Sequence, residues 1–399
     1  MELAEFFVTH VQWALPTWLI RLMVRTMLRL VGWQMRRADA VCRQIRCDRH
    51  ERRTAPVTTD TDKANEQHYG NDPRFFEAHL GPCLKYSACE WPDGTKDLAE
   101  AEVATLHIYQ ERARLSDLPA GSRVLELGCG WGSLTLANAT RFPDLHFTAF
   151  SNSPQQIEFI RSRADERGLT NVTLHVEDYA DFVHPDRSKV APEGTKPFDG
   201  AVAIETIEHA QNIAELLGAV AERLRPVRPS TARHAPPPHA LDRCARCGVQ
   251  GAVLFVQSLL HQTCSYLMDS TSWMGRNFFS GGSILALNSY YHLMPPTLYL
   301  SEITPVNGDG YSRTLLAWLD KLEAQRPMMV KRYGRQFYEG FRMFYLSCAE
   351  AFAANKGNEY MIGYYAFVRQ PTAAKTKAAS ATSLLPSLSL GRSWRASSA

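Results

Sequence analysis

The sequence predicts an α/β protein with a mostly parallel sheet and helices on both faces of that sheet. Short apolar strands alternate with helical segments from residue 123 onward, and the first strand runs directly into a glycine-rich turn that opens a helix. This alternation is typical of parallel strands joined by crossover helices. The chain has 399 residues, 45% of them apolar, which is enough for a core that holds a pocket.

The expected elements follow one another along the chain. Apolar residues at helical spacing predict a helix over residues 97–115. Short apolar runs predict the strands, at residues 123–127, 145–150, 172–176, 198–204 and 253–257. Helical segments separate these strands, beginning at Ser133 and covering residues 154–166 and 213–224. Pro16 is suited to the start of an N-terminal helix.

Three further segments lack these patterns. Residues 48–63 are polar and charged, which predicts a linker that closes an N-terminal arm over residues 1–60. Prolines interrupt residues 226–253, which we expect to form a flexible insertion. Residues 371–399 are rich in Ala and Ser and are expected to be a disordered tail.

The insertion contains four side chains that bind zinc in other proteins. Cys244 and Cys247 are separated by two residues, and His234 and His239 by four. Their order and the short interval between the pairs match no familiar zinc module. We therefore favour a solvated insertion or an artefact of gene prediction over a zinc site, and our interpretation requires no metal.

Charge is distributed unevenly. The formal net charge is +3, but residues 1–54 carry +5, residues 226–253 carry +3 and residues 371–399 carry +4, which leaves −9 for the rest. A mildly acidic body argues against a nucleic-acid partner and suits a cationic ligand. Nine scattered cysteines favour reduced thiols and a cytoplasmic location.

The N-terminal segment is apolar but contains regularly spaced arginines. Glu2 and Glu5 argue against a secretory signal. Arg21, Arg25 and Arg29 make a membrane span unfavourable, because each arginine at a bilayer centre costs roughly 2.5–3.5 kcal/mol. Three interpretations stay open: a helix packed on its own domain, which we favour; a peripheral membrane helix over residues 10–35; and a transit peptide.

The glycine-rich turn has the pattern E-x-G-x-G-x-G. Glu126 precedes Gly128, Gly130 and Gly132, and the glycines let a ligand approach the backbone closely. A dinucleotide fingerprint places a pyrophosphate at the helix N-terminus, whereas this spacing resembles motif I of class I methyltransferases. It therefore predicts S-adenosylmethionine as cofactor. The alternative is a glycine turn without a ligand.

An acidic residue follows the third strand. Asp178 is placed where a carboxylate accepts a hydrogen bond from an adenine amino group. The alternative is a solvated carboxylate at a strand end. The glycine motif earlier in the chain makes the adenine contact the favoured interpretation.

Further motifs narrow the prediction to one family. They are Leu84-Lys85-Tyr86-Ser87, Glu205-Thr206-Ile207-Glu208-His209 and Phe278-Phe279-Ser280-Gly281-Gly282. Together with the glycine motif, the chain resembles the cyclopropane-fatty-acid-synthase superfamily, and most of all its coclaurine N-methyltransferase-like plant branch. The resemblance covers roughly residues 10–370 except the insertion. It implies a Rossmann-like class I methyltransferase domain over residues 61–370, with a helical N-terminal arm and a helical substrate cap at about residues 258–350.

The resemblance also implies roles for individual residues. Those that match the family's cofactor contacts are Tyr86, Ser87, Glu126, Gly128, Gly130, Gly132, Ser151, Asn152, Gln156, Asp178 and Tyr179. Those that match the catalytic triplet beside the substrate amine are Glu205, Glu208 and His209. Tyr311 is expected at the substrate.

The chemistry of the triplet is plausible by itself. A carboxylate attracts a protonated amine, and a carboxylate or imidazole accepts the proton that must leave before nitrogen attacks a methyl group. The spacing places the three side chains near one another on a helical turn. Without the resemblance, a charged helix start is an equally good interpretation.

At two positions the sequence departs from the pattern of the cyclopropane synthases, and both departures bear on which molecule accepts the methyl group. Cyclopropane synthases resemble one another in holding a bicarbonate base with a Cys after Tyr-Ser and a His on the fifth strand. Here those positions are Ala88, with Cys89 one residue later, and Gln257, with His261 as a nearby substitute. Two other bicarbonate ligands are matched, Glu208 and Tyr311. The losses favour an amine acceptor, whose nitrogen is already a nucleophile.

Three hypotheses follow. The first is an S-adenosylmethionine-dependent N-methyltransferase acting on a small amine, with a benzylisoquinoline-like acceptor as one option. The second is a lipid methyltransferase or cyclopropane synthase acting on unsaturated acyl chains, docked by the N-terminal helix. The third is a non-catalytic relative that binds the cofactor or a partner. A homodimer is compatible with each of them.

Overall fold

Nine strands form the central sheet of the computed structural model, which describes residues 11–46, 48, 52–58, 72–227, 251–268, 272–279 and 281–370. The parallel half has the order β3-β2-β1-β4-β5. Its strands are β1 (Arg123–Leu127), β2 (His146–Ser151), β3 (Val172–Val176), β4 (Gly200–Ile204) and β5 (Val253–His261). Strand order reverses at β1, and ligands of open α/β sheets bind at such a point.

The other half of the sheet is partly antiparallel. β9 (Tyr360–Arg369) pairs with all nine residues of β5 and also with β8 (Leu298–Val306), in both cases antiparallel. β7 (Ser283–Ala286) pairs parallel with the end of β5 and antiparallel with β6 (Tyr266–Leu267). The resulting sheet is mostly parallel in its first five strands, which confirms the predicted fold class.

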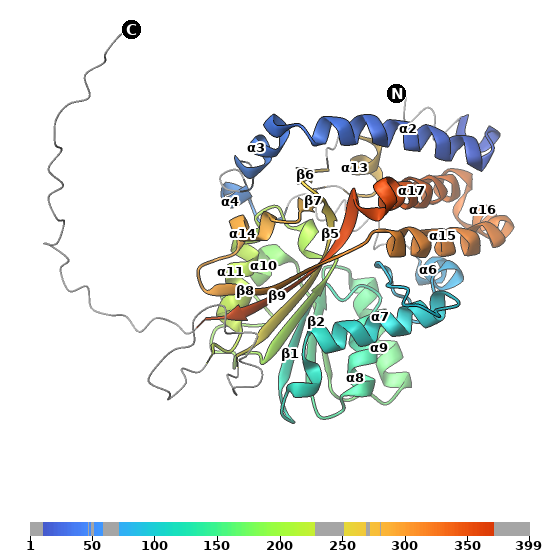
Figure 1. Cartoon of the computed structure of the whole chain (residues 1–399). Coiled ribbons are helices and arrows are strands. Elements are labelled where there is room, and N and C mark those ends of the chain that lie inside the picture. Colours follow the sequence, from blue (N-terminus) through green and yellow to red (C-terminus); the bar gives the residue numbers. More distant parts are fainter. Residues whose placement is uncertain are drawn as a thin grey trace, which may run out of the picture.

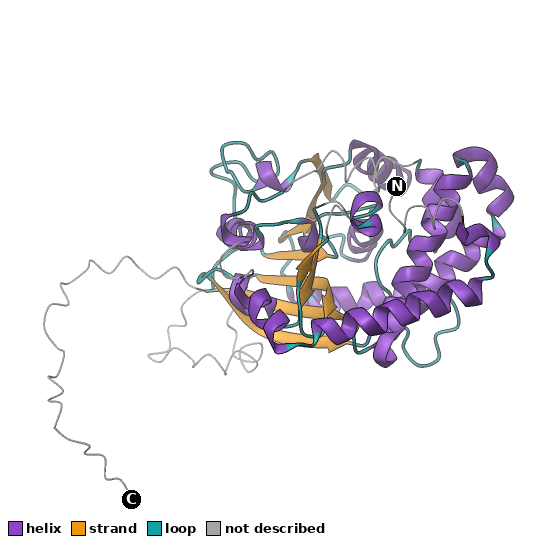
Figure 2. Ribbon diagram, turned by 90° about the horizontal axis from the view of Figure 1, so that it is seen from above, coloured by secondary structure: helices purple, strands orange, loops and turns teal. Residues whose placement is uncertain are grey.

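Helices cover both faces of the sheet, as Figure 2 shows from above. Neighbouring residues of β1 point to opposite faces: Val124 joins one buried cluster, and Leu125 and Leu127 join another. The helices in this part of the chain, on the two faces together, are α6 (Pro73–His79), α7 (Leu98–Arg112), α8 (Ser133–Arg141), α9 (Pro154–Glu166), α10 (Tyr179–Phe182) and α11 (Ile213–Arg223).

The later helices form a cap over the carboxyl ends of the strands (Figure 1). Buried aromatic side chains, among them Trp318, Tyr345 and Phe341, fill the space between them. The cap helices are α13 (Trp273–Asn277), α15 (Asp309–Ala324), α16 (Arg326–Tyr333) and α17 (Arg335–Ala353). α14 (Ser289–Leu293) lies apart from them, and its buried Tyr290 and Leu293 belong to the other hydrophobic cluster. The expected cap range 258–350 thus also contains the end of β5 and all of β8.

The N-terminal arm lies on this cap. It comprises α2 (Thr17–Met35), α3 (Ala38–Arg46) and the short α4 (Arg52–Thr54). α2 lies alongside α17 (Figure 1), and Glu350 of α17 accepts hydrogen bonds from Arg21 and Arg25. This is the packed helix that the sequence favoured. No described helix is both long enough and apolar enough to cross a membrane.

Some boundaries differ from those expected. β5 continues to His261 because β9 pairs with its whole length. Residues 48 and 52–58 of the expected linker pack against the domain: Asp48 binds Arg52, Ser265 and Ser289, and Val57 is buried. Most of the insertion and all of the tail, residues 228–250 and 371–399, lie outside the described residues. The two Cys and two His that were considered as zinc ligands fall within the first of these ranges.

Candidate active site

The glycine turn lies between β1 and α8, at the point where strand order reverses. Gly128 and Gly130 have φ of 67° and 52°, a backbone region that favours glycine. A Cβ at Gly128 would collide with Thr206, whereas a Cβ at Gly130 would meet nothing within 4 Å. The space beside Gly130 therefore belongs to a cavity, and Gly130 lines it.

Gly132 has a different role. It caps α8 with a φ of 81°, and a Cβ there would press on Ile160 of α9 at 2.7 Å. Gly132 is not among the residues that line the cavity. Its glycine is explained by the close packing of α8 against α9 rather than by a ligand.

The cavity beside the turn, called the first pocket below, brings together twelve of the residues predicted for the site. They come from the carboxyl ends of β1 to β4, the segments that follow them and the loop before α7. The twelve are Tyr86, Ser87, Glu126, Gly128, Gly130, Ser151, Asn152, Gln156, Asp178, Tyr179, Glu205 and His209.

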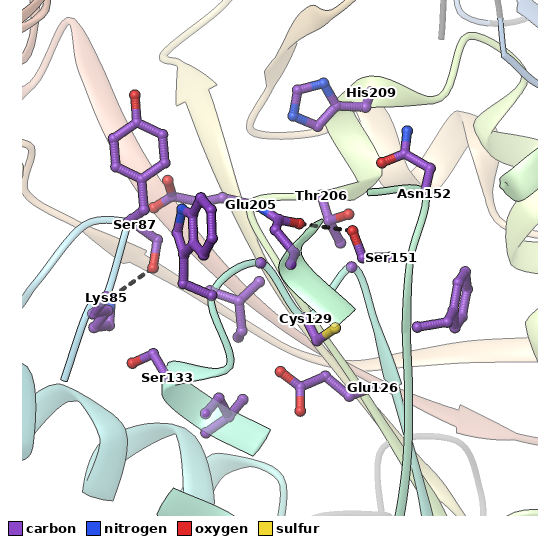
Figure 3. A pocket seen from close by; sticks show the side chains of 18 of the residues that line it. Lys85, Ser87, Glu126, Cys129, Ser133, Ser151, Asn152, Glu205, Thr206 and His209 are labelled. Carbon is purple, nitrogen blue, oxygen red and sulfur yellow. Dashed lines mark hydrogen bonds between the residues drawn. The ribbon is translucent and has the colours of Figure 1, made fainter. Parts of the chain in front are cut away.

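Ser151 fixes the position of Gln156. The Ser151 hydroxyl (Figure 3) donates a hydrogen bond of 2.7 Å to Gln156 Oε1. The Nε2 group of this buried side chain has no hydrogen-bond partner in the described part of the chain. Trp131 Nε1 and Ser133 Oγ, which also line the first pocket, are likewise buried without a hydrogen-bond partner among the described residues. Such orphaned groups are costly unless a ligand or water pairs with them.

Asp178 and Tyr179 close another side of the first pocket. Asp178 Oδ1 accepts from the Thr58 hydroxyl at 2.9 Å, so the N-terminal arm reaches the pocket edge. The Tyr179 hydroxyl bonds to Thr206 at 2.5 Å, and Thr206 in turn lies against Gly128. The preceding acid, Glu177, accepts from Ser188 and two backbone N–H groups and holds the loop at residues 188–190.

The loop at residues 84–91 covers the first pocket. Leu84 has a φ of 52°, which turns the chain sharply before Lys85. The buried Lys85 ammonium donates to the Ser87 hydroxyl at 2.8 Å (Figure 3). It also donates to the Ala88 carbonyl and lies over the Tyr109 ring. These contacts fix the covering loop, and Tyr86 within it lines both the first pocket and a second one.

The second pocket lies between the end of β4 and the cap. Three predicted residues, Tyr86, Glu205 and His209, line both pockets and so mark their junction. The other residues of the second pocket are Glu208, Leu259, Met268, Phe279, Gly282, Ser283, Ile284, Tyr311 and Phe344. The predicted substrate residue Tyr311 therefore lies in a separate, mostly apolar space.

Glu205 holds the junction together. Its φ of 48° places a non-glycine residue in the left-handed region, which costs of order 1–3 kcal/mol and occurs mostly at functional sites. Its Oε1 accepts from Ala88 N–H at 2.8 Å and from Gln257 Nε2 at 2.5 Å. Burial raises the Glu205 pKa to about 7, although Lys85 and these two hydrogen bonds act in the opposite direction.

Glu208 lies deeper. Its Oε1 accepts from the backbone N–H of Leu259 at 2.5 Å, and its Oε2 is buried without a partner in the described part of the chain. Burial, together with the nearby Glu205 carboxylate, raises the Glu208 pKa to about 8. Burial also lowers the His209 pKa to about 4, so this imidazole is neutral at physiological pH and only weakly basic.

Of the three side chains at or near the two changed bicarbonate positions, one lies at the site and two do not. Gln257 lies at the site through its bond to Glu205, as expected from its place on β5. His261 does not substitute for it: the ring bonds Glu359 and the backbone at residues 263 and 264, and it lines neither pocket. Cys89 is buried beside Thr314 and also lines neither pocket.

Sequence reasoning missed several lining residues. Trp131 and Ser133 could have been found, because they lie inside or directly after the glycine turn. Thr58 could not, because it belongs to a segment that lacks any apolar period. The same holds for Phe279 and Phe344, whose aromatic rings carry no signal that separates a pocket from a core.

Comparison with known proteins agrees with this geometry. The family model for mycolic acid cyclopropane synthetase matches residues 57–361. (S)-coclaurine N-methyltransferase of Thalictrum flavum subsp. glaucum is 27% identical over 339 residues, 80% of this chain and 82% of that protein. Cyclopropane-fatty-acyl-phospholipid synthase of Escherichia coli (strain K12) is 25% identical over 295 residues, 72% of this chain and 64% of that protein.

A solved structure matches as well. Coclaurine N-methyltransferase bound to N-methylheliamine and SAH superposes with a TM-score of 0.73 at 25% identity, covering 89% of this chain and 96% of that chain. The sheet, the glycine turn and these similarities define an S-adenosylmethionine-dependent methyltransferase of class I. The chain belongs to the mycolic acid cyclopropane synthetase family. Family, fold class and cofactor are thereby confirmed as predicted.

The first pocket suits this cofactor. The unpartnered donors of Gln156, Trp131 and Ser133 fit a ligand rich in acceptor atoms, and the open space at Gly130 lets it lie against the backbone. When bound, S-adenosylmethionine supplies a methyl group on a positively charged sulfur. Which predicted residues contact it stays a prediction, and so do a homodimer and a cytoplasmic location.

Proposed function

We propose that the protein transfers a methyl group to the nitrogen of a small amine, with a compact aromatic amine of the benzylisoquinoline type as acceptor. One observation carries this proposal. Glu205 and His209 stand where the first and second pockets meet, and Glu208 lines the second pocket with an unpartnered carboxylate oxygen. A protonated amine needs an anionic partner when it leaves water, and it needs a proton acceptor before its nitrogen reacts.

The three groups divide this work. Glu208 Oε2 attracts the ammonium, because it is buried and makes no hydrogen bond within the described residues. Glu208 also takes the proton, because its raised pKa makes it the strongest base of the three, and the neutral His209 lies beside the amine at the junction of the pockets. Glu205 acts chiefly as a positioning residue, because Ala88 and Gln257 already occupy its Oε1.

The walls of the second pocket suit the rest of such an acceptor. Phe279, Phe344, Tyr86 and Tyr311 present aromatic surface beside two acidic groups. Aromatic faces bind apolar rings and also stabilise a nearby cation through its attraction to the π-system. The similarity to (S)-coclaurine N-methyltransferase supports this substrate class.

A lipid acceptor is the second candidate. Similarity to the Escherichia coli synthase supports it, and so does the exposed apolar side of α2 described below. Ala88 and Gln257 argue against cyclopropanation, because neither supplies the thiol or imidazole that the resemblance associates with a bicarbonate base.

Methyl transfer from labelled S-adenosylmethionine distinguishes the two. The purified full chain is offered a pool of secondary and tertiary amines and, separately, unsaturated phospholipid vesicles. We expect label in an amine product and none in lipid. Label in lipid alone would refute the amine proposal, and Glu208→Ala serves as the control that removes label from the correct product.

A further inference from the structure

The outward side of α2 is apolar and exposed. Of eleven large apolar side chains exposed in the described residues, six belong to this one helix. Trp18, Leu30 and Trp33 are 66%, 64% and 62% exposed. Residues three and four apart share one side of a helix, so the six form a continuous ridge, called the α2 apolar face: Trp18, Leu22, Met23, Met27, Leu30 and Trp33.

The inward side of α2 is occupied by the protein itself. Ile20 is fully buried, and Val24 and Leu28 pack against the main core. Arg21 and Arg25 reach Glu350 of α17, whose side chain is 2% exposed. The helix is therefore apolar on both sides, and such helices are normally covered on both sides. Folding of the described residues leaves the second side open.

The positive charge around the α2 apolar face indicates what kind of surface this face binds. The nineteen residues of α2 contain three arginines and no Asp or Glu. Arg25 and Arg36 pair with Glu350 and Glu359 yet keep 51% and 48% of their side chains exposed, and Arg29, on the same edge of the ridge, is exposed too. Tryptophans near both ends and arginines along an edge are features of helices that lie in the surface of an anionic membrane.

A second copy of the chain fits less well. A symmetric dimer through this face would bring one acid-free helix against another, so that arginines of the two copies approach one another. Like charges in a partly desolvated contact are unfavourable. An anionic lipid surface instead accepts the ridge between its chains and pairs with the arginines.

We propose that the α2 apolar face docks the protein on an anionic lipid surface. α17 links this surface to the site, because it carries both Glu350, which holds α2, and Phe344, which lines the second pocket. Docking would thus place the second pocket one helix layer away from lipid, where apolar acceptors accumulate. The proposal does not depend on the nature of the acceptor.

Vesicle flotation with the full-length protein tests the proposal. The vesicles contain either phosphatidylcholine alone or phosphatidylcholine with about 30 mol % phosphatidylglycerol. We expect binding to the anionic vesicles, loss of that binding in high salt, and about tenfold weaker binding by a Met27→Glu/Leu30→Glu variant. Arg29→Gln should weaken binding to anionic vesicles without changing the level seen with neutral ones.

A matched variant controls for charge and folding. Val103→Glu/Tyr291→Glu adds the same two carboxylates at exposed positions away from α2 and should bind vesicles as the unchanged protein does. Circular dichroism and S-adenosylhomocysteine binding check that each variant is folded. Equal flotation of the α2 variant and the unchanged protein would overturn the proposal. So would absent vesicle binding together with a dimer that the α2 variant disrupts, because the face would then contact a second copy.

Discussion

Glu205 Oε1 accepts a hydrogen bond of 2.8 Å from the backbone N–H of Ala88. The bond joins the end of β4 to the loop that covers the first pocket, across 117 residues of sequence. Gln257 holds the same oxygen from the other side. The position of the covering loop is therefore set by a residue at the entrance to the second pocket, which couples the two spaces.

Glu205→Ala should raise the KM for S-adenosylmethionine about tenfold or more, because a hydrogen bond to a charged group contributes roughly 1.5–3 kcal/mol. The measurement is steady-state methyl transfer with the cofactor varied. Glu208→Ala is the matched control, since Glu208 does not line the first pocket. An unchanged KM for the cofactor in Glu205→Ala, with folding intact, would contradict the assigned role.

Glu208→Ala should lower kcat by roughly 10²–10⁴-fold while cofactor affinity stays close to that of the unchanged protein. The reason is that Glu208 lines only the second pocket and offers its free oxygen there. Calorimetry with S-adenosylhomocysteine measures the affinity and single-turnover kinetics the methyl transfer. If affinity collapses together with turnover, Glu208 belongs to the cofactor site instead.

The pH dependence of methyl transfer should show a rising limb between about pH 7 and 8. Burial raises the pKa of Glu205 to about 7 and that of Glu208 to about 8, so both lose their protons as pH rises through this window. The ionised carboxylates bind the ammonium, so kcat/KM rises with them. Glu208→Gln should flatten the upper part of the limb; an identical profile in this variant would exclude Glu208 as its origin.

Gly130→Val should abolish cofactor binding, because its side chain would enter open space of the first pocket. Gly121→Val is a matched control: Gly121 also has a positive φ, and its Cβ also would meet nothing within 4 Å. Both changes should destabilise the fold by about 1–2 kcal/mol through backbone strain. Only Gly130→Val should prevent S-adenosylhomocysteine binding in calorimetry, and retained binding would refute its place in the pocket.

Glu126→Gln should alter how stability depends on pH. Burial raises the Glu126 pKa from 4.5 to about 8, and the Thr135 hydroxyl bond only partly offsets this. A raised carboxyl pKa means that the folded state binds the extra proton, so this stabilisation is complete below about pH 4.5 and is lost as pH rises to about 8. A glutamine does not titrate.

Thermal unfolding from pH 5 to 9 measures this effect in the apo protein. The Tm of Glu126→Gln should increase relative to that of the unchanged protein as pH rises, and the difference should level off above about pH 8. A difference that stays constant over the whole range would mean that Glu126 is ionised in the folded state.

The sequence by itself determined the architecture, because the information needed was local. Alternating apolar runs located the first four strands to within about two residues, and helix 154–166 was located at its observed bounds. The glycine turn predicted its cofactor because its spacing and positive φ values are properties of a few neighbouring residues. Pairing with β9 lengthened β5 beyond its sequence signal, because a strand's end depends on its partners.

Only the tertiary structure decided how the site is assembled. It separated Gly132, which packs on Ile160, from Gly130, which lines the cavity, although the two have the same sequence signature. It showed that Gln257 binds Glu205 at the site, whereas His261, four residues later on the same strand, binds Glu359. It also turned the apolar side of α2 outward, because Ile20 is buried on the opposite side and Arg21 and Arg25 bind the buried Glu350. Contacts between residues hundreds of positions apart leave no local pattern, so packing alone determines which side chains meet.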